Sequence, residues 1–455
     1  MPVEVSKEHA VQIQQSLSRR SLLAGLGMAG LGLGLSGCGT ALSTGIAGTG
    51  PGADSLTYWN LFSGGDGVRM VAMQDGYQKA HPAVDLNAVT LSWGAPYYTK
   101  LALATLGKRP PDVGVSHVSR VPTLAKAGLL APLDESILAK HGMTSDKFTP
   151  KAWKQAQVDG ELYAIPLDTH PFVLYYNTDI CKKAGLLDSD GRLKNLDGPT
   201  AFIDALQAVK KITGQYGGVV NINADPSTCW RWFATLYGQL GGQMLADDGR
   251  KVVIDETKAV KALTYMADLT TGKKLMPSNI DGGGVTMLFS TGKVGFLLDG
   301  EWQLTTYQAT PVHFDMTPVP NILGGKYATF ADSHTLVLPK DSKRTPDRMD
   351  LDLAFVRSLL DQSLTWAKGG HVPAWLPVQT SAEYKALKPN SHYVAAAEAA
   401  YYDPTAWYSG AGSDFENIVG SIIATVESGQ QHPEQAVAHM RSKLTQYANT
   451  KPPVT

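Results

Sequence analysis

Tryptophans and their neighbours are the residues of this chain best suited to binding chemistry. Of the nine tryptophans, several stand beside glycines, turns or charged residues rather than on regular apolar stripes: Trp230-Arg231-Trp232, Gly300-Glu301-Trp302, Trp366, Trp375 and Trp407-Tyr408. A flat aromatic ring covers an apolar ligand face, and polar neighbours fix the orientation of the ligand. Sugars have both apolar C–H faces and hydroxyls, so these clusters suit a sugar site. Core packing is the alternative for any tryptophan, and it is our expectation for Trp59 and Trp153.

The carboxylate residues of the chain make an enzyme the alternative to a binding protein. Glycosidases need two carboxyl groups about 5–10 Å apart, and four residues could supply such a pair: Asp168, Asp225, Asp281 and Glu301. Nothing in the sequence orders them as acid and base, and the G-x-S-x-G serine motif is absent. A lipid-anchored glycan hydrolase is therefore the minor alternative, and we expect the chain not to be an enzyme.

Motifs for metals and cofactors are missing as well. The chain has no C-x-x-C and no H-E-x-x-H, so we expect no metal site and no cofactor. Residues 25–30 fit G-x-G-x-x-G, but they follow no strand and open no helix, so they do not indicate dinucleotide binding.

The N-terminal segment has the pattern of an export signal. Arg19 and Arg20 precede an apolar run over 22–35, which at about 1.5 Å per residue is too short to cross a bilayer. The run ends in Leu35-Ser36-Gly37-Cys38, which is similar to the lipobox of bacterial lipoproteins. We predict a signal peptide over 1–38 with lipidation at Cys38, and the paired arginines also fit twin-arginine export. The Gly- and Ser-rich residues 39–53 predict a flexible tether.

Composition narrows the function classes. A net charge of −1 and a pI of about 6.8 lack the basic surface that nucleic-acid binding requires. The roughly 400 residues after the tether exceed one ordinary core and predict two lobes. Cys181 and Cys229 remain after Cys38, and their spacing leaves open one disulfide or two buried thiols.

Strand and helix signals alternate along the chain, which predicts an α/β fold. Two extended runs, 162–167 and 172–176, are separated by Asp168-Thr169-His170-Pro171, and this break suits a crossover between lobes. A helical stripe through Phe202 and Val209 ends at Gly214. Thr345-Pro346 predicts the N-cap and first residue of another helix.

The order of these pieces resembles the extracellular sugar-binding proteins of ABC importers, the broad family that includes maltose-binding protein. The segments that carry the resemblance are PPDVGVSHVSRVPTLAKAGLLAPLDE, DGELYAIPLDTHPFVLYYNTDICKKAGL, LYGQLGGQML, FSTGKVGFLLDGEW and ESGQQHPEQAVAHM. The resemblance implies a two-lobed, type II periplasmic-binding-protein-like α/β fold, with hinge crossovers and a ligand cleft between the lobes. It places 54–167 with 310–372 in lobe one, and 168–309 with 373–455 in lobe two.

The resemblance also implies a function and partners. The chain would capture a mono- or oligosaccharide and deliver it to the transmembrane subunits of a permease by hinge closure. It would act as a monomer, held by lipid on the outer face of the bacterial membrane. A glycerophosphodiester or phosphorylated polyol is the alternative ligand, with Arg120 or Arg231 as the phosphate clamp.

Candidate ligand-binding residues follow from matching positions and from the aromatic clusters: Phe62, Ser63, Asp66, His117, Arg120, Asp168, His170, Trp230, Arg231, Trp232, Gly300, Trp302, Trp375 and Trp407. Some of them have simpler roles open to them. Asp66 could cap a helix, Asp168 could bridge at a crossover, and the arginines could be surface charges. The first loop lacks the acidic–basic pair of the maltose protein, which argues against maltose itself.

Overall fold

The computed structural model describes residues 55–223 and 225–452. The predicted signal peptide, the Cys38 lipidation site and the tether lie outside these residues. Within the described ranges, no helix combines the length and apolar character needed to cross a membrane.

The first sheet has the strand order β2-β1-β3-β14-β6. Its strands are β1 (Ser55–Asn60), β2 (Asp85–Thr90), β3 (Val113–His117), β6 (Ile165–Pro166) and β14 (His334–Val337). β1 pairs in parallel with β2 and β3, whereas β14 runs antiparallel to β3. The run SLTYWN forms β1 as predicted, with Leu56 and Tyr58 buried on alternate positions.

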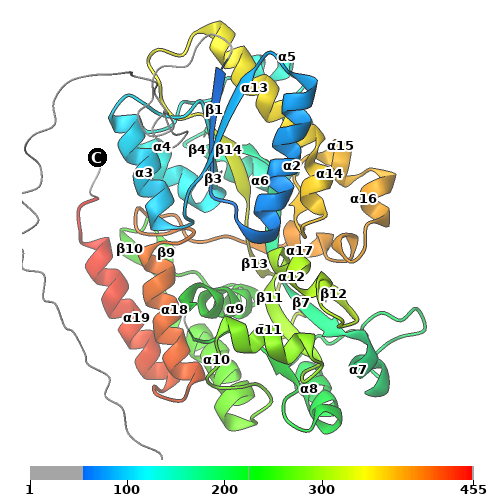
Figure 1. The fold of residues 1–455 in the computed structure, drawn as a ribbon. Coiled ribbons are helices and arrows are strands. Elements are labelled where there is room, and N and C mark those ends of the chain that lie inside the picture. The colour runs from blue at the N-terminus through cyan, green and yellow to red at the C-terminus, as the bar shows by residue number, and fades with distance from the viewer. Residues whose placement is uncertain (1–54, 224, 453–455) are drawn as a thin grey trace, which may run out of the picture. The chain divides into compact units, whose positions relative to one another are not determined.

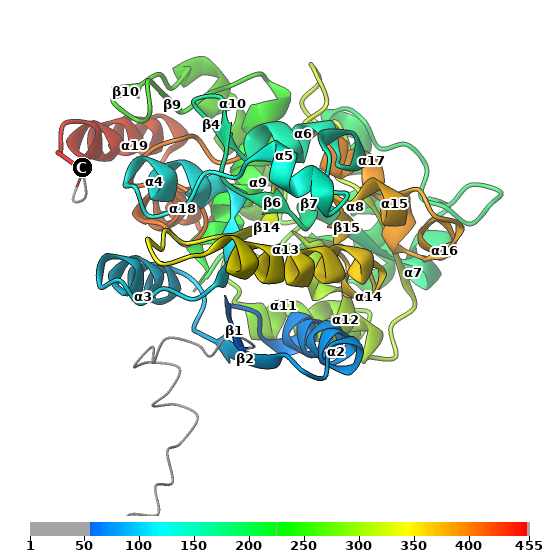
Figure 2. The same cartoon turned by 90° about the horizontal axis from the view of Figure 1, so that it is seen from above.

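Nine helices of the described residues surround this sheet: α2 (Gly64–Ala80), α3 (Ala95–Leu106), α4 (Val121–Lys126), α5 (Glu135–Lys140), α6 (Pro150–Gln155), α13 (Pro346–Asp361), α14 (Ser363–Ala367), α15 (Leu376–Gln379) and α16 (Ala382–Ala386). Figure 2 shows α2, α13 and α14 near one another, and α2 contacts both of the others. Met70, Met73 and Tyr77 form the buried face of α2, whereas Ala80, which the sequence pattern places on the same face, is exposed. The Thr345 side chain accepts a hydrogen bond from the backbone N–H of Arg348, which confirms the predicted N-cap of α13.

The second sheet is built around one long strand. Its strands are β7 (Asp168–Asn177), β8 (Gly218–Val219), β11 (Phe296–Gly300), β12 (Phe314–Pro318), β13 (Thr329–Asp332), β15 (Val372–Pro373) and β16 (Ala400–Tyr401). β7 is buried over all ten residues. Its side chains alternate between two cores: Phe172, Leu174 and Tyr176 face one, and Val173 and Tyr175 face the other. Such burial on both faces explains its apolar run.

The break predicted at residues 168–171 is wrong. These residues form the first part of β7, because β15 pairs with Asp168 and Thr169 and β13 pairs with His170 and Pro171. Pairing with these neighbouring strands therefore supplies backbone hydrogen bonds that keep residues 168–171 extended. The sequence alone suggests an irregular backbone there.

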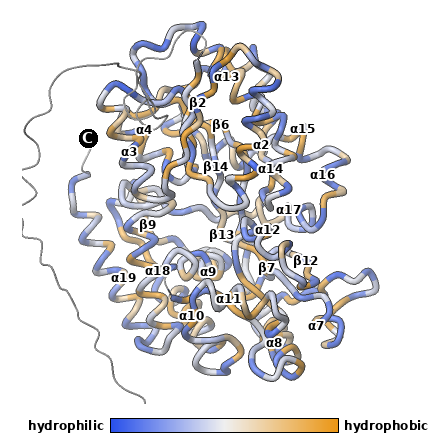
Figure 3. Tube along the Cα trace, in the orientation of Figure 1, coloured by the Kyte–Doolittle hydropathy of each residue, from blue (hydrophilic) through white to orange (hydrophobic). Residues whose placement is uncertain are grey.

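The remaining helices of the described residues belong with the second sheet: α7 (Thr178–Lys183), α8 (Pro199–Thr213), α9 (Pro226–Gln239), α10 (Glu256–Ala267), α11 (Gly282–Ser290), α12 (Leu304–Gln308), α17 (Val394–Glu398), α18 (Asp414–Glu427) and α19 (Pro433–Ala448). Two short hairpins complete the fold: β4 (Gln157–Val158) with β5 (Glu161–Leu162), and β9 (Leu245–Ala246) with β10 (Lys251–Val252). α18 and α19 lie side by side, and Figure 3 shows hydrophobic and hydrophilic residues alternating along both. α8 ends at Gly214 with a left-handed φ of 79°, as predicted.

Strand pairing shows where the chain passes between the two sheets. β6 belongs to the first sheet and β7 to the second, so we propose that the first passage lies at Leu167. β12 and β13 pair with β7, so we propose that the chain returns to lobe one after Asp332 rather than near residue 310. Trp375 packs in the core of the first sheet and Tyr393 in a core of the second. We therefore propose a third passage between these two residues rather than at residue 372.

The two cysteines of the described residues are buried free thiols. Cys181 lies in α7, and Cys229 lies in α9. Burial raises the pKa of the Cys181 thiol to about 12, so this side chain behaves as a small apolar group. The open choice between a disulfide and two thiols is thus settled in favour of the thiols.

A buried carboxyl in α18 predicts an unusual dependence of stability on pH. Glu427 is 1% exposed, and neither of its carboxyl oxygens has a hydrogen-bond partner within the described residues. Burial raises the pKa of Glu427 to about 8. The folded state keeps this proton at pH values where the unfolded chain has lost it, so the free energy of unfolding falls as pH rises from about 4 to about 8.

Glu427→Gln should remove this dependence, because the amide keeps the shape and cannot ionise. We expect the variant to match wild type near pH 4 and to be more stable above pH 8, by on the order of a few kcal/mol. Denaturant unfolding at both pH values measures the difference. The exposed Glu434 supplies the control Glu434→Gln, and equal pH profiles for all three proteins would contradict the prediction.

Candidate functional site

A cavity of about 490 Å³ lies where the two sheets meet, and segments of both contribute to its wall. From the first sheet come the loop after β1, the end of β3, the start of β14 and Trp93. From the second come β7, β13, the start of α9, the α12 region and the start of α18. The lining residues are Leu61, Phe62, Ser63, Gly64, Gly65, Asp66, Trp93, His117, His170, Asp225, Arg231, Trp302, Gln303, Thr305, Thr306, Phe330, Asp332, His334, Ala411 and Glu416.

Aromatic rings form one part of the cavity wall. Trp302 follows β11 in a short 3₁₀ turn (Glu301–Gln303) and is half-buried. The guanidinium carbon of Arg231 lies 5.0 Å from the Trp302 ring centre, and the edge of His170 approaches the same ring at 5.7 Å. Trp93 is 44% exposed beside the cavity. These rings offer flat apolar surface to a ligand.

Several polar groups on the wall have unused hydrogen-bonding capacity. Oε2 of Glu416 accepts bonds from Ser227 Oγ at 3.0 Å and from the backbone N–H of Gly412 at 2.7 Å. Oε1 of Glu416 and Nε of Arg231 are buried, and neither has a hydrogen-bond partner in the described chain. Because unpaired buried polar atoms are costly, one acceptor and one donor remain for a ligand in the cavity.

Asp332 is a carboxyl at the end of β13 with partners from the first lobe. Ser119 donates to it through its hydroxyl at 2.5 Å and through its backbone N–H at 3.2 Å. Burial raises the pKa of Asp332 to about 6, although these hydrogen bonds oppose the shift. The pair therefore joins the two lobes at the cavity wall.

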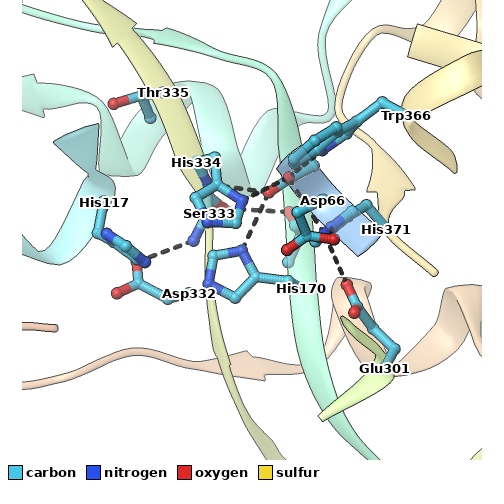
Figure 4. A network of polar contacts seen from close by, with 12 residues as sticks. Asp66, His117, His170, Glu301, Asp332, Ser333, His334, Thr335, Trp366 and His371 are labelled. Atoms are coloured by element: carbon cyan, nitrogen blue, oxygen red, sulfur yellow. Dashed lines mark hydrogen bonds and ion pairs between the residues drawn. The ribbon is translucent and has the colours of Figure 1, made fainter. Parts of the chain in front are cut away.

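A cluster of histidines surrounds one aspartate (Figure 4), and two of its members, His170 and His334, line the cavity. Asp168 is fully buried and accepts hydrogen bonds from His170 Nδ1 at 3.1 Å and from His334 Nδ1 at 2.8 Å. Trp366 Nε1 donates to Asp168 at 2.6 Å, and the backbone N–H of His334 donates at 2.8 Å. Burial, with the neighbouring His334, lowers the pKa of His170 to about 3.

His371 does not line the cavity, but it contacts Asp66, which does. Its Nε2 lies 3.0 Å from Asp66 Oδ1, and its Nδ1 lies 3.0 Å from Glu301 Oε1. Burial opposes charge on this ring, but Glu301 and Asp66 raise the pKa of His371 well above its usual value. The ring also stacks on Trp366 with centroids 4.3 Å apart.

Comparison with known proteins identifies the family. Residues 63–361 match the family model of the bacterial extracellular solute-binding proteins. The chain belongs to this family. As a solute-binding protein it is a binding component and not an enzyme, as the sequence predicted, so the minor alternative of a hydrolase is excluded.

Curated relatives are distant in sequence. An arabinooligosaccharide-binding protein of Bacillus subtilis is 28% identical over 254 residues, which cover 55% of this chain and 54% of the relative. A maltooligosaccharide ABC transporter solute-binding lipoprotein of Streptococcus pneumoniae is 24% identical over 298 residues, covering 63% and 65% of the two chains. This solute-binding protein thus spans between about half and two thirds of the length of these relatives.

Solved structures share the fold. The GacH receptor of Streptomyces glaucescens superimposes with a TM-score of 0.72 at 21% identity, covering 87% of this chain and 99% of that chain. The maltose–maltodextrin binding protein of Alicyclobacillus acidocaldarius gives a TM-score of 0.67 at 20% identity, covering 86% and 99%. The predicted two-lobed, periplasmic-binding-protein-like α/β fold is confirmed.

Half of the predicted ligand-binding residues line the cavity: Phe62, Ser63, Asp66, His117, His170, Arg231 and Trp302. Asp168 lies beneath the lining, where it holds His170 and His334. Gly300 lies against Trp302: a Cβ on this glycine would meet the ring at 2.1 Å. Its role is to leave space for the tryptophan.

The other predicted residues pack elsewhere, and their placement at a ligand is corrected. Trp230 and Trp232 are buried in the core of the second lobe, and Trp375 is buried in that of the first. Trp407 packs against Tyr408 and Tyr447. Arg120 lies over the Tyr98 ring and donates to the carbonyl of Ser409, so its charge has a structural role. Trp59 and Trp153 are buried, as expected.

The sequence reasoning missed several lining residues, including Trp93, Asp332, His334 and Glu416. Asp332 and His334 flank the point where β13 ends and β14 begins. Trp93 stands directly before Gly94, a turn position like those that drew attention to other tryptophans. Glu416 lies within the first turn of α18, and the resemblance to the maltose protein marks it only as the position near which a stacking tryptophan of that protein aligns.

Proposed function

We propose that this protein captures a sugar in the cavity and delivers it to the membrane subunits of an ABC importer. The observation that carries the proposal is the Trp302 ring beside the unpartnered Arg231 Nε and Glu416 Oε1. This combination matches the apolar faces and hydroxyls of a sugar. The names of relatives that bind arabino- and maltooligosaccharides support this class of ligand.

A phosphorylated ligand is the second candidate, because Arg231 faces the cavity as that alternative requires. The charges on the cavity wall argue against a phosphorylated ligand. Four carboxylate side chains share the lining with the single arginine: Asp66, Asp225, Asp332 and Glu416. A phosphate dianion would meet a predominantly acidic wall, whereas a neutral polyol gains hydrogen-bond acceptors from it.

Hinge closure is the proposed mechanism of capture. A ligand that touches both lobes stabilises the arrangement in which they lie together. Contacts between the lobes support this arrangement: Lys126 Nζ lies 2.6 Å from Asp248 Oδ2, and Arg120 donates to Ser409. The three passages between the lobes, at Leu167, after Asp332 and between Trp375 and Tyr393, would carry the rotation.

A thermal-shift screen of the purified chain tests the function. The panel contains arabino- and maltooligosaccharides, common disaccharides, glycerophosphodiesters and polyol phosphates. A sugar at 100 times its dissociation constant should add about 2.7 kcal/mol to the free energy of unfolding. A shift with phosphorylated compounds alone would replace the sugar proposal with the second candidate, and no shift with any compound would contradict both.

We further propose that the protein is held on the outer face of the membrane by lipid on Cys38. The lipobox-like residues 35–38 support this, as does the lipoprotein named among the relatives. Cys38→Ala should leave the protein unlipidated, so that it appears in the soluble or secreted fraction instead of the membrane fraction. Fractionation with immunoblotting measures the change, with Cys181→Ala as the control, and a Cys38→Ala protein that stays firmly in the membrane would refute lipid anchoring at this residue.

A further inference from the structure

We propose that Asp168, His170, His334 and His371 bind a divalent transition-metal ion, with Zn²⁺ as the best match. Each residue offers one ligand atom, and the four atoms all lie within 4.8 Å of one another. All four side chains are buried. Three imidazoles and one carboxylate are a ligand set that suits Zn²⁺ in four-fold coordination. This inference does not depend on the identity of the transported solute.

The spacing around Asp168 fits a shared metal ion. Zinc binds imidazole nitrogen and carboxylate oxygen at about 2.0–2.2 Å, so tetrahedral ligand atoms lie roughly 3.4 Å from one another. The Asp168 oxygens lie 3.1 Å from His170 Nδ1, 2.8 Å from His334 Nδ1 and 3.5 Å from His371 Nδ1. His334 and His371 face the same Asp168 oxygen, Oδ2, and His170 faces Oδ1, so all three distances lie within about 0.6 Å of the value for a metal site.

His371 supplies an independent observation. Its side chain is fully buried, and its Nδ1 makes no well-aligned hydrogen bond within the described residues although Glu301 Oε1 lies only 3.0 Å away. The same atom faces both Asp168 and Glu301. Its Nε2 contacts Asp66 Oδ1 at 3.0 Å, the kind of carboxylate contact that orients metal-bound histidines. When a metal displaces the Nδ1 proton and the other ring proton stays at Nε2 beside Asp66, the Nδ1 lone pair can point to the ion.

The surrounding charge also favours a cation. Three carboxylates, from Asp66, Asp168 and Glu301, lie within 3.5 Å of His371 ring nitrogens. Both oxygens of Glu301 are buried without a hydrogen bond from the described residues. A divalent ion would offset the negative charge more completely than one imidazolium.

The alternative is that the cluster holds only protons and no metal, because His170 and His334 can donate hydrogen bonds to Asp168 through Nδ1. A metal would displace these Nδ1 protons while Trp366 Nε1 and the backbone N–H of His334 continue to donate to Asp168. Metal binding must therefore release protons. The ligands come from β7, β14 and the segment just before β15, so the ion would also tie together the strands that connect the lobes.

The test is a Zn²⁺ titration of the full chain after treatment with a chelator. Calorimetry in two buffers of different ionisation enthalpy should give one ion per chain with proton release. Co²⁺ in place of Zn²⁺ should give the visible absorption of a tetrahedral site. His334→Gln and His371→Gln should each weaken Zn²⁺ binding at least tenfold. His313→Gln is the matched control, because His313 forms a similar ion pair with Asp179 that is 75% and 62% exposed.

Equal Zn²⁺ affinity in wild type and in both cluster variants would overturn the proposal, as would a wild-type protein that binds no Zn²⁺. If the variants fail to fold, histidine ¹⁵N spectra of wild type decide the question. Zn²⁺ should then shift the Nδ1 signals of three histidines together, and unchanged signals at saturating Zn²⁺ would mean that protons alone hold the cluster.

Discussion

Replacing Trp230 by alanine is expected to lower the free energy of unfolding by about 3–5 kcal/mol. Trp230 is fully buried, its Nε1 donates to Asp403 Oδ1 at 2.6 Å, and its ring meets the edge of Phe415 at 4.8 Å. Alanine removes the ring from a close-packed core and leaves a buried carboxyl without its donor. Equilibrium unfolding in denaturant measures the loss.

Trp230→Phe is the matched control, because it keeps most of the buried surface and removes the N–H donor. Its cost should be smaller, near the 1–3 kcal/mol of an unsatisfied buried polar group. If Trp230→Ala unfolded like wild type but no longer bound the sugar, Trp230 would be a ligand surface after all.

The contrast between Trp230 and its neighbour shows what local sequence can indicate and where it fails. Trp230-Arg231-Trp232 near Pro226 has the pattern of an exposed turn. The structure places it in α9, where twelve of fourteen residues are buried and Arg231 is one of the two exceptions. A helix packed on nearly all sides buries aromatic residues whatever their spacing, so the single charged residue marks the face toward the cavity.

Local sequence was sufficient to predict the structure where a few adjacent residues determine the backbone conformation. The stripe of α8 with Gly214, the Thr345 cap of α13 and the alternation in β1 are all properties of a few adjacent residues. The order of such elements was enough to predict the two-lobed fold. Lobe boundaries near 310 and 372 required knowledge of which strands pair with β7, and that pairing is a property of the whole sheet.

The histidine cluster is the clearest case of a site without a local signature. Its members lie at 168, 170, 334 and 371, and no spacing rule for metal ligands spans such separations. They meet because β14 and β15 both return to the start of β7 or to its neighbours. Only Asp168 and His170 could be chosen from the sequence, and they were chosen as sugar contacts rather than as parts of one buried network.

Trp302→Ala is expected to weaken sugar binding by about 10- to 100-fold, or roughly 1.4–2.7 kcal/mol, while the free energy of unfolding changes by less than about 1 kcal/mol. Trp302 is half-buried and lines the cavity, with the guanidinium of Arg231 5.0 Å from its ring centre. Its loss removes the flat surface for a sugar face and the partner that orients Arg231. Calorimetry with the best sugar from the screen measures the affinity.

A substitution at Gly300 tests the role of the Trp302 ring in sugar binding a second time. A methyl group at Gly300 would meet the Trp302 ring, so Gly300→Ala should displace the ring and weaken sugar binding although Trp302 is still present. Trp407→Ala is the matched control, because Trp407 is also half-buried and does not line the cavity. Wild-type affinity in both Trp302→Ala and Gly300→Ala would mean that the sugar does not stack on this ring, and the binding surface would then have to be sought at Trp93 and Phe62 on the opposite lobe.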